Sequence, residues 1–269
     1  MSLDLWPHLG SLGRMIQVPG TASETASAEE RYVFQTTVEG RRRAQVLPAS
    51  PRSWEVSLPF ATGPRLAALD AFARGAWGPG PWNWVTVQAQ TGNLLTPREA
   101  LLLDRFAASS LSDAGPTRVS DGSWAPRSLD VDLASGWVWV TPRGIPVVSD
   151  RSVTWAADVE GSSPQIQMSF YDAAGTQLAA HVSSAGGAGM TRVAISAAPP
   201  PGAVSVRVGA RSSVSRLARP QVTWTSAPVA WAPGHGCPSA VLVGLSTSLT
   251  VVRRSGPLGS ASFTVMEVA

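Results

Sequence analysis

The sequence predicts a mainly β protein: a β-sandwich with one flanking helix, joined to an inserted β-sandwich of the jelly-roll type. Apolar and polar residues alternate in many short runs, which is the period of half-buried strands. Gly and Pro, 25 and 22 of the 269 residues, separate these runs and mark turns. Hydrophobic residues make up 44% of the chain and charged residues 14%, a balance that supports a buried core and argues against disorder.

The first 105 residues predict several strands and one helix. We expect residues 1–30 to form an extended arm or loop, with regular structure from Arg31 onward. Gly63 and Pro64 suit a helix start, and Gly75 suits its end. In order, we expect strands at 31–38, 41–46 and 53–58 with a tight turn at Glu39-Gly40, a helix over 63–75, a rigid turn at 78–81, a strand at 82–87 and a loop at 93–97.

The middle of the chain has a different composition and a different pattern of predicted elements. Residues 107–123, rich in Ser, Ala, Asp and Gly, predict a domain boundary, and short strands without a helix follow. Regularly spaced short strands with Gly and Pro turns are typical of a sandwich or jelly roll. We expect strands at 137–139, 153–159, 166–170, 193–195, 204–208 and 222–224, with turns at 172–175 and 199–202.

The end of the chain is expected to return to the first domain. Residues 231–234 predict a second boundary, and two strand-like stretches follow at 241–252 and 262–268. These two strands cannot bury a face by themselves, so we expect them to pair with the first sheet. This predicts a discontinuous first domain, 1–105 and 226–269, and an inserted jelly-roll domain over 106–225.

Charge and cysteine content limit the classes of function. All 21 basic residues are Arg against 18 acidic residues, so the net charge of +3 is weak support for nucleic-acid binding. Cys237 is the single cysteine, which excludes an intrachain disulfide and favours folding in a reducing cytoplasm. Residues 1–19 lack the features of a signal peptide, and the apolar runs are too short to cross a bilayer. We expect the chain to leave a cell only as part of a particle.

Several short motifs occur in an order found in one family of phage proteins. They are FQTTVEGRR at 34–42, PRSWEV at 51–56, the helix at 66–74, GAWGPGPW at 75–82, NLLTP at 93–97 and SFTVMEV at 262–268. Together they resemble distal tail proteins, often called minor tail proteins, of actinobacterial siphophages. The resemblance covers roughly residues 30–105 and the last 40 or so.

This resemblance implies a virion structural protein of the tail tip or baseplate, assembled in the host cytoplasm. Members of the family form a ring, usually a homohexamer, between the tail tube protein and the hub, fibre or other minor tail proteins. Edge strands of neighbouring copies build the annulus, and DNA only passes through its lumen. The second domain, galectin-like or carbohydrate-module-like, projects outward. An alternative function is binding of host cell-wall glycan through residues 106–225.

The candidate subunit-interface residues are arginines and tryptophans of the first domain. Arg41, Arg42 and Arg43 could contact a neighbouring subunit or passing DNA, or simply protect a solvated hairpin edge with charge. DNA must slide through a tail without sticking, so we favour the edge or the subunit contact. Trp77 and Trp82 could contact a neighbour across the ring, but a rigid turn whose rings fill the core is the favoured interpretation.

Aromatic residues of the inserted domain are candidates for stacking on sugar rings. Trp124, Trp137 and Tyr171 are the main ones, because a flat ring complements the apolar face of a pyranose. Trp139 and Trp155 belong to the same set. Packing inside the sandwich is the favoured alternative, so we expect at most one or two of these rings to be exposed.

The sequence does not predict an enzyme, a metal site or a cofactor. Residues 106–225 contain a single Glu, Glu160, and its neighbour Asp158 on the same strand face cannot flank a glycosidic bond from the opposite side. The G-x-S-x-G and H-E-x-x-H motifs do not occur. His235 and Cys237 are two potential metal ligands with no second pair nearby.

Overall fold

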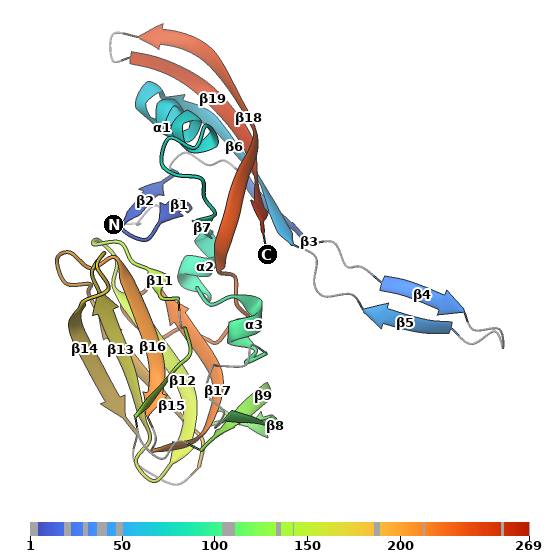
Figure 1. The fold of residues 1–269 in the computed structure, drawn as a ribbon, viewed down its shortest axis with the longest axis vertical. Coiled ribbons are helices and arrows are strands. Elements are labelled where there is room, and N and C mark those ends of the chain that lie inside the picture. Colours follow the sequence, from blue (N-terminus) through green and yellow to red (C-terminus); the bar gives the residue numbers. More distant parts are fainter. Residues whose placement is uncertain are drawn as a thin grey trace.

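A computed structural model describes residues 5–18, 23–28, 32–36, 42–46, 51–103, 111–132, 136–141, 143–185, 189–211, 213–253 and 256–268. The predicted fold class is confirmed: the chain is mainly β, its sheets are antiparallel, and its few helices are short (Figure 1). One seven-stranded sheet and one two-layered sandwich make up most of the molecule. A separate hairpin lies away from both (Figure 1).

The seven-stranded sheet combines strands from both ends of the chain. Its order is β2-β1-β7-β18-β19-β6-β3. The expected pairing of the closing strands with the first sheet is observed, since Phe263 lies opposite Val56. The strands are β1 (His8–Ser11), β2 (Arg14–Gln17), β3 (Ser23–Ala28), β6 (Arg52–Thr62), β7 (Trp82–Val85), β18 (Cys237–Arg253) and β19 (Gly256–Glu267).

Helix α1 (Gly63–Ala73) packs on one face of this sheet. Pro64 occupies the first turn of the helix, where the missing N–H costs no hydrogen bond. Leu69 and Phe72 point into the core formed with the sheet. A Cβ atom at Gly259 would lie 3.1 Å from Leu66 Cδ1, so the absence of a side chain there lets the helix approach the strand.

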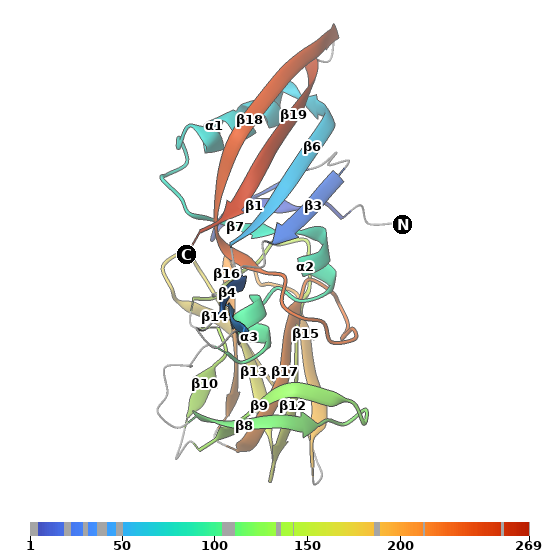
Figure 2. The same cartoon turned by 90° about the vertical axis from the view of Figure 1, so that its right-hand side faces the viewer.

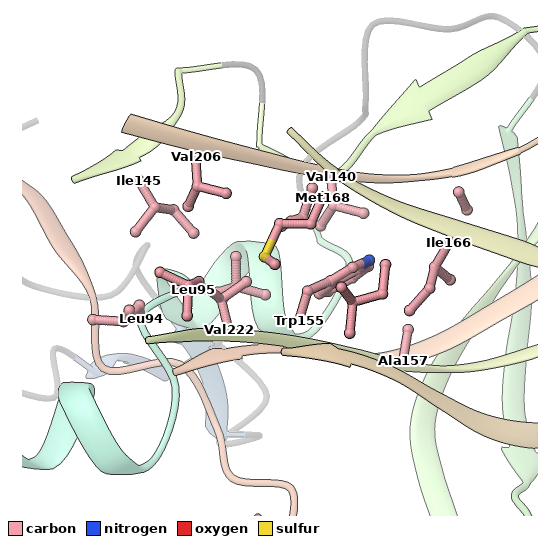
Figure 3. Packing of buried hydrophobic residues seen from close by; sticks show 14 of the residues in the cluster. Leu94, Leu95, Val140, Ile145, Trp155, Ala157, Ile166, Met168, Val206 and Val222 are labelled. Carbon is pink, nitrogen blue, oxygen red and sulfur yellow. The ribbon is translucent and has the colours of Figure 1, made fainter. Parts of the chain in front are cut away.

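The sandwich has two five-stranded sheets facing each other. One has the order β10-β16-β13-β14, with β11 also paired to β16, and the other has the order β15-β12-β17-β9-β8. Trp155, Ile166 and Met168 fill the space between them (Figure 3). The strands are β8 (Leu111–Arg118), β9 (Trp124–Val131), β10 (Trp137–Trp139), β11 (Ile145–Pro146), β12 (Val153–Gly161), β13 (Gln165–Tyr171), β14 (Gln177–Ser184), β15 (Thr191–Ala197), β16 (Ser205–Arg211) and β17 (Val214–Thr223).

The segment between β7 and β8 joins the sheet to the sandwich. It contains α2 (Val87–Thr91) and α3 (Pro97–Ala100), and Leu94 and Leu95 between them enter the sandwich core (Figure 3). Asn93 is fully buried there. Its Nδ2 donates to the carbonyls of Pro220 and Ala232, and its Oδ1 accepts from the N–H groups of Leu95 and Val222.

Several sequence-based expectations are corrected by the structure. Residues 1–30 are not only arm or loop, because they contribute β1, β2 and β3. The Ser/Thr/Ala/Glu composition of β3 has no strand periodicity, and pairing with β6 holds it in the sheet. Likewise β8 lies inside the stretch predicted as a boundary, 107–123. The helices α2 and α3 were not expected, and α3 begins in the predicted loop at 93–97 with a capping box between Thr96 and Glu99.

Other expectations agree with the structure in part. The helix predicted over 63–75 is α1. The two strands expected near 31–46 are β4 (Tyr32–Thr36) and β5 (Arg42–Val46), but they form a sheet of their own, and the turn at Glu39-Gly40 lies outside the described residues. The boundary at 105/106 also lies outside them. The apolar residues of α2 and α3, counted within 1–105 by the sequence, pack in the core of the sandwich.

Candidate functional site

The outer edge of β18 is long, uncharged and open. β7 pairs with β18 only as far as Ala240, and no other described strand lies on that side of β18 beyond this residue. Residues 240–252 include no charged side chain. Such an edge presents unpaired N–H and C=O groups and is a template for another strand. Three large apolar side chains of this strand are exposed: Val243 by 38%, Leu249 by 62% and Val251 by 44%.

The opposite edge of the same sheet is β3. The two open edges lie on opposite sides of the sheet (Figure 2). The hairpin β4–β5 branches off between β3 and β6, and therefore on the β3 side (Figure 1). Arg42 and Arg43 begin β5, whereas Arg41 and the side chains of this hairpin lie outside the described residues. An isolated two-stranded hairpin is marginally stable in water, so β4–β5 gains stability only by contact with another surface.

The two predicted interface tryptophans have different environments. Trp82 is buried in the core of its own chain, with its ring edge-on to Phe72 at 5.2 Å between centroids, so the favoured core interpretation is confirmed for this residue. Trp77 stacks on the same Phe72 at 5.2 Å and an interplanar angle of 16°, but it remains 40% exposed. Of the two tryptophans, Trp77 is therefore the one with enough exposed surface to contact a neighbouring subunit.

The sandwich carries aromatic and arginine side chains on the outer face of the sheet β10-β16-β13-β14. Val138 faces the core, so Trp137 and Trp139 on either side of it lie on the outer face and are half-buried. The favoured core placement is therefore wrong for these two rings and correct for Trp155, which is fully buried. Tyr171 lies on the same outer face at the end of β13.

Two arginines of β16 each lie over one of these rings. The Arg207 guanidinium lies 4.7 Å from the centroid of Tyr171, and that of Arg211 lies 5.8 Å from Trp137. Arg211 also donates to Gln165 Oε1 at 2.7 Å. Neither arginine forms an ion pair with a carboxylate in the described part of the chain. Sequence reasoning missed both, although the alternation Arg-x-Gly-x-Arg in a strand was visible.

Comparisons with known proteins show remote likeness only. The sequence matches no family model and no curated protein. A tailspike domain of bacteriophage CBA120 aligns with 49% of this chain at a TM-score of 0.34 and 14% identity, and the match spans 21% of that structure. A carbohydrate-binding module from a Cellvibrio mixtus lichenase, solved with cellotriose, aligns with 42% of this chain and 90% of its own length, at a TM-score of 0.28 and 15% identity.

A two-module structure from a Clostridium thermocellum endo-1,4-β-D-xylanase shows a likeness of similar extent to this chain. It aligns with 43% of this chain and 25% of its own length, at a TM-score of 0.32 and 8% identity. All these TM-scores are below 0.5 and all identities below 25%, so none of these likenesses transfers a function to this chain.

The remaining sequence-based candidate for sugar stacking, Trp124, begins β9 on the other sheet. It is 62% exposed, and Arg118 lies 5.7 Å from the centre of its ring. Trp124 is therefore distant in topology from Trp137 and Tyr171, and the three do not form one site. Arg118 and Trp124 provide a matched aromatic–arginine pair for comparison with the pairs on β16.

The Asp158 carboxylate, on β12, forms ion pairs with two guanidinium groups. It is fully buried and accepts from Arg192 at 3.0 Å and from Arg219 at 2.8 Å, and Ser120 adds a hydroxyl donor. Glu160 lies 3.7 Å from Arg216 in a more exposed setting. A buried carboxylate held by two guanidinium groups is poorly placed to exchange a proton with a substrate.

A cavity of about 480 Å³ lies beside the N-terminal segment and β3, with Glu24, Trp54 and His235 among its lining. Burial raises the pKa of Glu24, while contacts with the Val87 backbone and the Trp84 side chain act in the opposite direction. Burial also raises the pKa of Cys237 to about 12, so its thiol is protonated at neutral pH.

Two kinds of feature are absent from the described ranges. No group of three or more His, Cys, Asp or Glu residues within them is arranged to hold a metal ion. No helix within them is long and apolar enough to cross a membrane.

Proposed function

We propose that this chain is a non-catalytic structural protein of a phage tail tip, and that it forms a ring joining the tail tube to hub or fibre proteins. The observation that carries the proposal is the open outer edge of β18. A soluble monomer normally protects such an edge with charge, proline, a β-bulge or a covering segment. β18 has register shifts opposite β19 between Val243 and Ser246 and between Leu249 and Val251. Over residues 240–252 the sequence contains none of the charges or prolines, and three large apolar side chains are exposed there.

The position of the two open edges supports a ring. β18 and β3 lie on opposite sides of one sheet (Figure 2), and the β4–β5 hairpin leaves from the β3 side. Contact between different surfaces of successive copies is heterologous, and it closes into a ring when the rotation between copies divides a full turn. The β3 side of one copy, with its hairpin, thus meets β18 of the next copy. The family resemblance adds the expectation of six copies and of neighbours in a tail.

The absence of catalysis is part of the proposal. Asp158 and Glu160 are the two carboxylates that the sequence placed on one strand face of the inserted domain. Two arginines hold the first and Arg216 lies beside the second. An assay of the purified protein on host cell wall tests this: release of soluble fragments above the level of buffer would contradict it.

Edge variants test the ring. Val243→Lys and Val251→Lys place charge on the outer edge of β18 and should convert the oligomer into monomers, as measured by native mass spectrometry. Leu178→Lys is the matched control, because Leu178 is 41% exposed on β14, an edge strand of the sandwich. This control should keep the wild-type mass. An oligomer of unchanged mass in both β18 variants would refute the proposed contact.

A second candidate function is supported by a separate observation. Trp137, Trp139 and Tyr171 share the outer face of a sandwich sheet with two arginines and are half-buried, although the core was the favoured place for them. Partly exposed aromatic rings on a sheet face can stack on the apolar faces of pyranose rings. The sandwich of a tail-tip ring would then bind host cell-wall glycan. Both functions are compatible in one particle.

A further inference from the structure

The strand register places the aromatic and arginine residues of the sandwich on one continuous face. Trp137 lies opposite Arg211, and Trp139 lies opposite Gly209, on the antiparallel pair β10–β16. Arg207 lies opposite Ser169 on β13. Cross-strand partners project from the same side of a sheet, so these side chains form one surface. The intervening residues, among them Val206, Val208 and Met168, fill the core.

The charge of this face is unusual within the sandwich. No Asp or Glu occurs in β10, β13, β14 or β16. Most other arginines of the sandwich pair with carboxylates: Arg127 with Asp113, Arg151 with Asp150, Arg192 and Arg219 with Asp158, and Arg216 with Asp130. The two on β16 instead lie over aromatic rings, and in the described part of the chain Arg211 donates one hydrogen bond, to Gln165 Oε1. A surface with fixed cations and no counter-charge is complementary to an anion.

We propose that this face binds an acidic saccharide, one whose sugar rings carry carboxylate groups. This inference rests on the glycan-binding role proposed for the sandwich and names the ligand class. The rings of Trp137, Trp139 and Tyr171 contact the apolar faces of pyranoses. Arg207 and Arg211 donate paired N–H groups to carboxylates, for which the planar guanidinium is well shaped.

The spacing favours an oligosaccharide over a single sugar. Arg207 and Arg211 are four residues apart on one strand, which corresponds to roughly 13 Å at the rise of an antiparallel strand. That distance exceeds the length of one pyranose ring. The ring of Trp139 lies over Gly209 between the two arginines: a Cβ atom there would be 3.1 Å from Trp139 Cε3. The lack of a side chain at Gly209 keeps the middle of the face flat.

Isothermal titration of the full chain with trigalacturonate tests the proposal, with maltotriose as the neutral probe and a glycerol phosphate oligomer as the phosphate probe. We expect trigalacturonate to bind best and its affinity to fall with added salt. The double variant Arg207→Gln/Arg211→Gln should lose roughly tenfold or more in affinity, as expected when charge-assisted hydrogen bonds are removed. Trp137→Ala should also weaken binding. Arg118→Gln and Trp124→Ala, the matched pair on the other sheet, should bind as wild type.

The possible results distinguish binding of an acidic saccharide from glycan binding in general. Binding of maltotriose equal to that of trigalacturonate, unaffected by the double arginine variant, would overturn the acidic ligand and leave glycan binding intact. Preference for the glycerol phosphate oligomer would overturn the carboxylate and keep an anionic site. No binding of any probe at millimolar concentration would overturn both glycan proposals. The ring proposal is independent of this result and is tested by the mass of the particle. Thermal unfolding of each variant should match wild type, which excludes loss of fold as the cause.

Discussion

Two edge strands, β8 of the sandwich and β18 of the seven-stranded sheet, differ in their charge. In the sandwich, the edge strand β8 carries Asp113, Pro116 and Arg118, which discourage pairing with another chain. In the seven-stranded sheet, β18 runs uncharged past Ala240 with its outer side unpaired. The two facing sheets of the sandwich enclose a core within one chain. In the proposed ring, contact with another copy would complete the seven-stranded sheet.

The two regions also bury their residues differently. The sandwich encloses Trp155, Phe170 and Met168 between two sheets, and all three are inaccessible to solvent (Figure 3). The seven-stranded sheet has α1 on one face, and small polar residues such as Ser57 and Ser262 project from the other. In the proposed assembly the sheet would gain further burial from a neighbouring copy, whereas the sandwich core would not change.

The largest single effect on stability is expected at Asp158, inside the sandwich. Asp158→Asn leaves Arg192 and Arg219 without their shared buried carboxylate and should lower the free energy of unfolding by about 3–5 kcal/mol. Urea denaturation measures it. Asp130→Asn is the control, because Asp130 and its partner Arg216 are both well exposed, and a change of about 0.5 kcal/mol or less is expected. Equal effects at both positions would show that the buried network does not hold the sandwich together.

The junction between the two regions is the next target. Asn93→Ala removes four buried hydrogen bonds to the backbone and should cost about 2–4 kcal/mol. It should also separate the unfolding of the sheet from that of the sandwich, which calorimetry would record as two transitions. A single transition at the wild-type temperature would mean that Asn93 does not couple the regions.

A third prediction concerns the stability of the folded chain at acidic pH. His8 of β1 lies edge-on to Trp224 of the sandwich at 5.1 Å, and burial lowers its pKa to about 4, with Asp150 and Arg151 acting in opposite directions nearby. The unfolded chain, with an ordinary histidine pKa, takes up a proton before the folded chain does. Stability should therefore fall by about 2 kcal/mol between pH 7 and pH 5.

His8→Gln tests that assignment, because glutamine does not titrate. The variant should lose this part of the pH dependence, whatever its stability at pH 7. Denaturation curves at pH 7 and pH 5 give the difference for both proteins. The same slope in wild type and variant would assign the acid sensitivity to other groups.

The smallest effect is expected at Glu24, on the edge strand β3. Burial raises the pKa of Glu24, so the folded chain binds this proton more tightly than the unfolded chain. The resulting stabilisation is present at low pH and is lost as the pH rises through the folded pKa. Glu24→Gln should thus raise the melting temperature slightly at pH 7 and leave it unchanged near pH 3.5. A lower melting temperature at pH 7 would indicate that the contacts of charged Glu24 with Val87 and Trp84 outweigh the cost of its burial.

Local patterns in the sequence were sufficient for the elements whose own residues favour them. Pro64 with the spacing of Leu69 and Phe72 predicted α1, and the alternation around Trp155 predicted β12. The strands β3 and β8 could not be predicted in this way. Their small and polar residues have no periodicity, and their conformation is imposed by pairing with β6 and β9.

The surfaces were harder to predict than the elements. The alternation Trp137, Val138, Trp139 identifies a strand but not which side of it is buried. Only the register with β16 shows that Val138 faces the core and that the tryptophans share a face with Arg211. The open edge of β18 also escaped prediction, because it depends on how far β7 extends along its neighbour.

Hydrogen–deuterium exchange along β18, followed at several protein concentrations, tests the central claim most directly. If a second copy covers the outer edge, the amides over residues 241–251 that do not bond to β19 should be protected in the assembled form. They should exchange quickly on dilution, while the amides of β12 in the sandwich stay protected throughout. Rapid exchange of the outer β18 amides at every concentration, in a particle with the mass of one chain, would contradict the account.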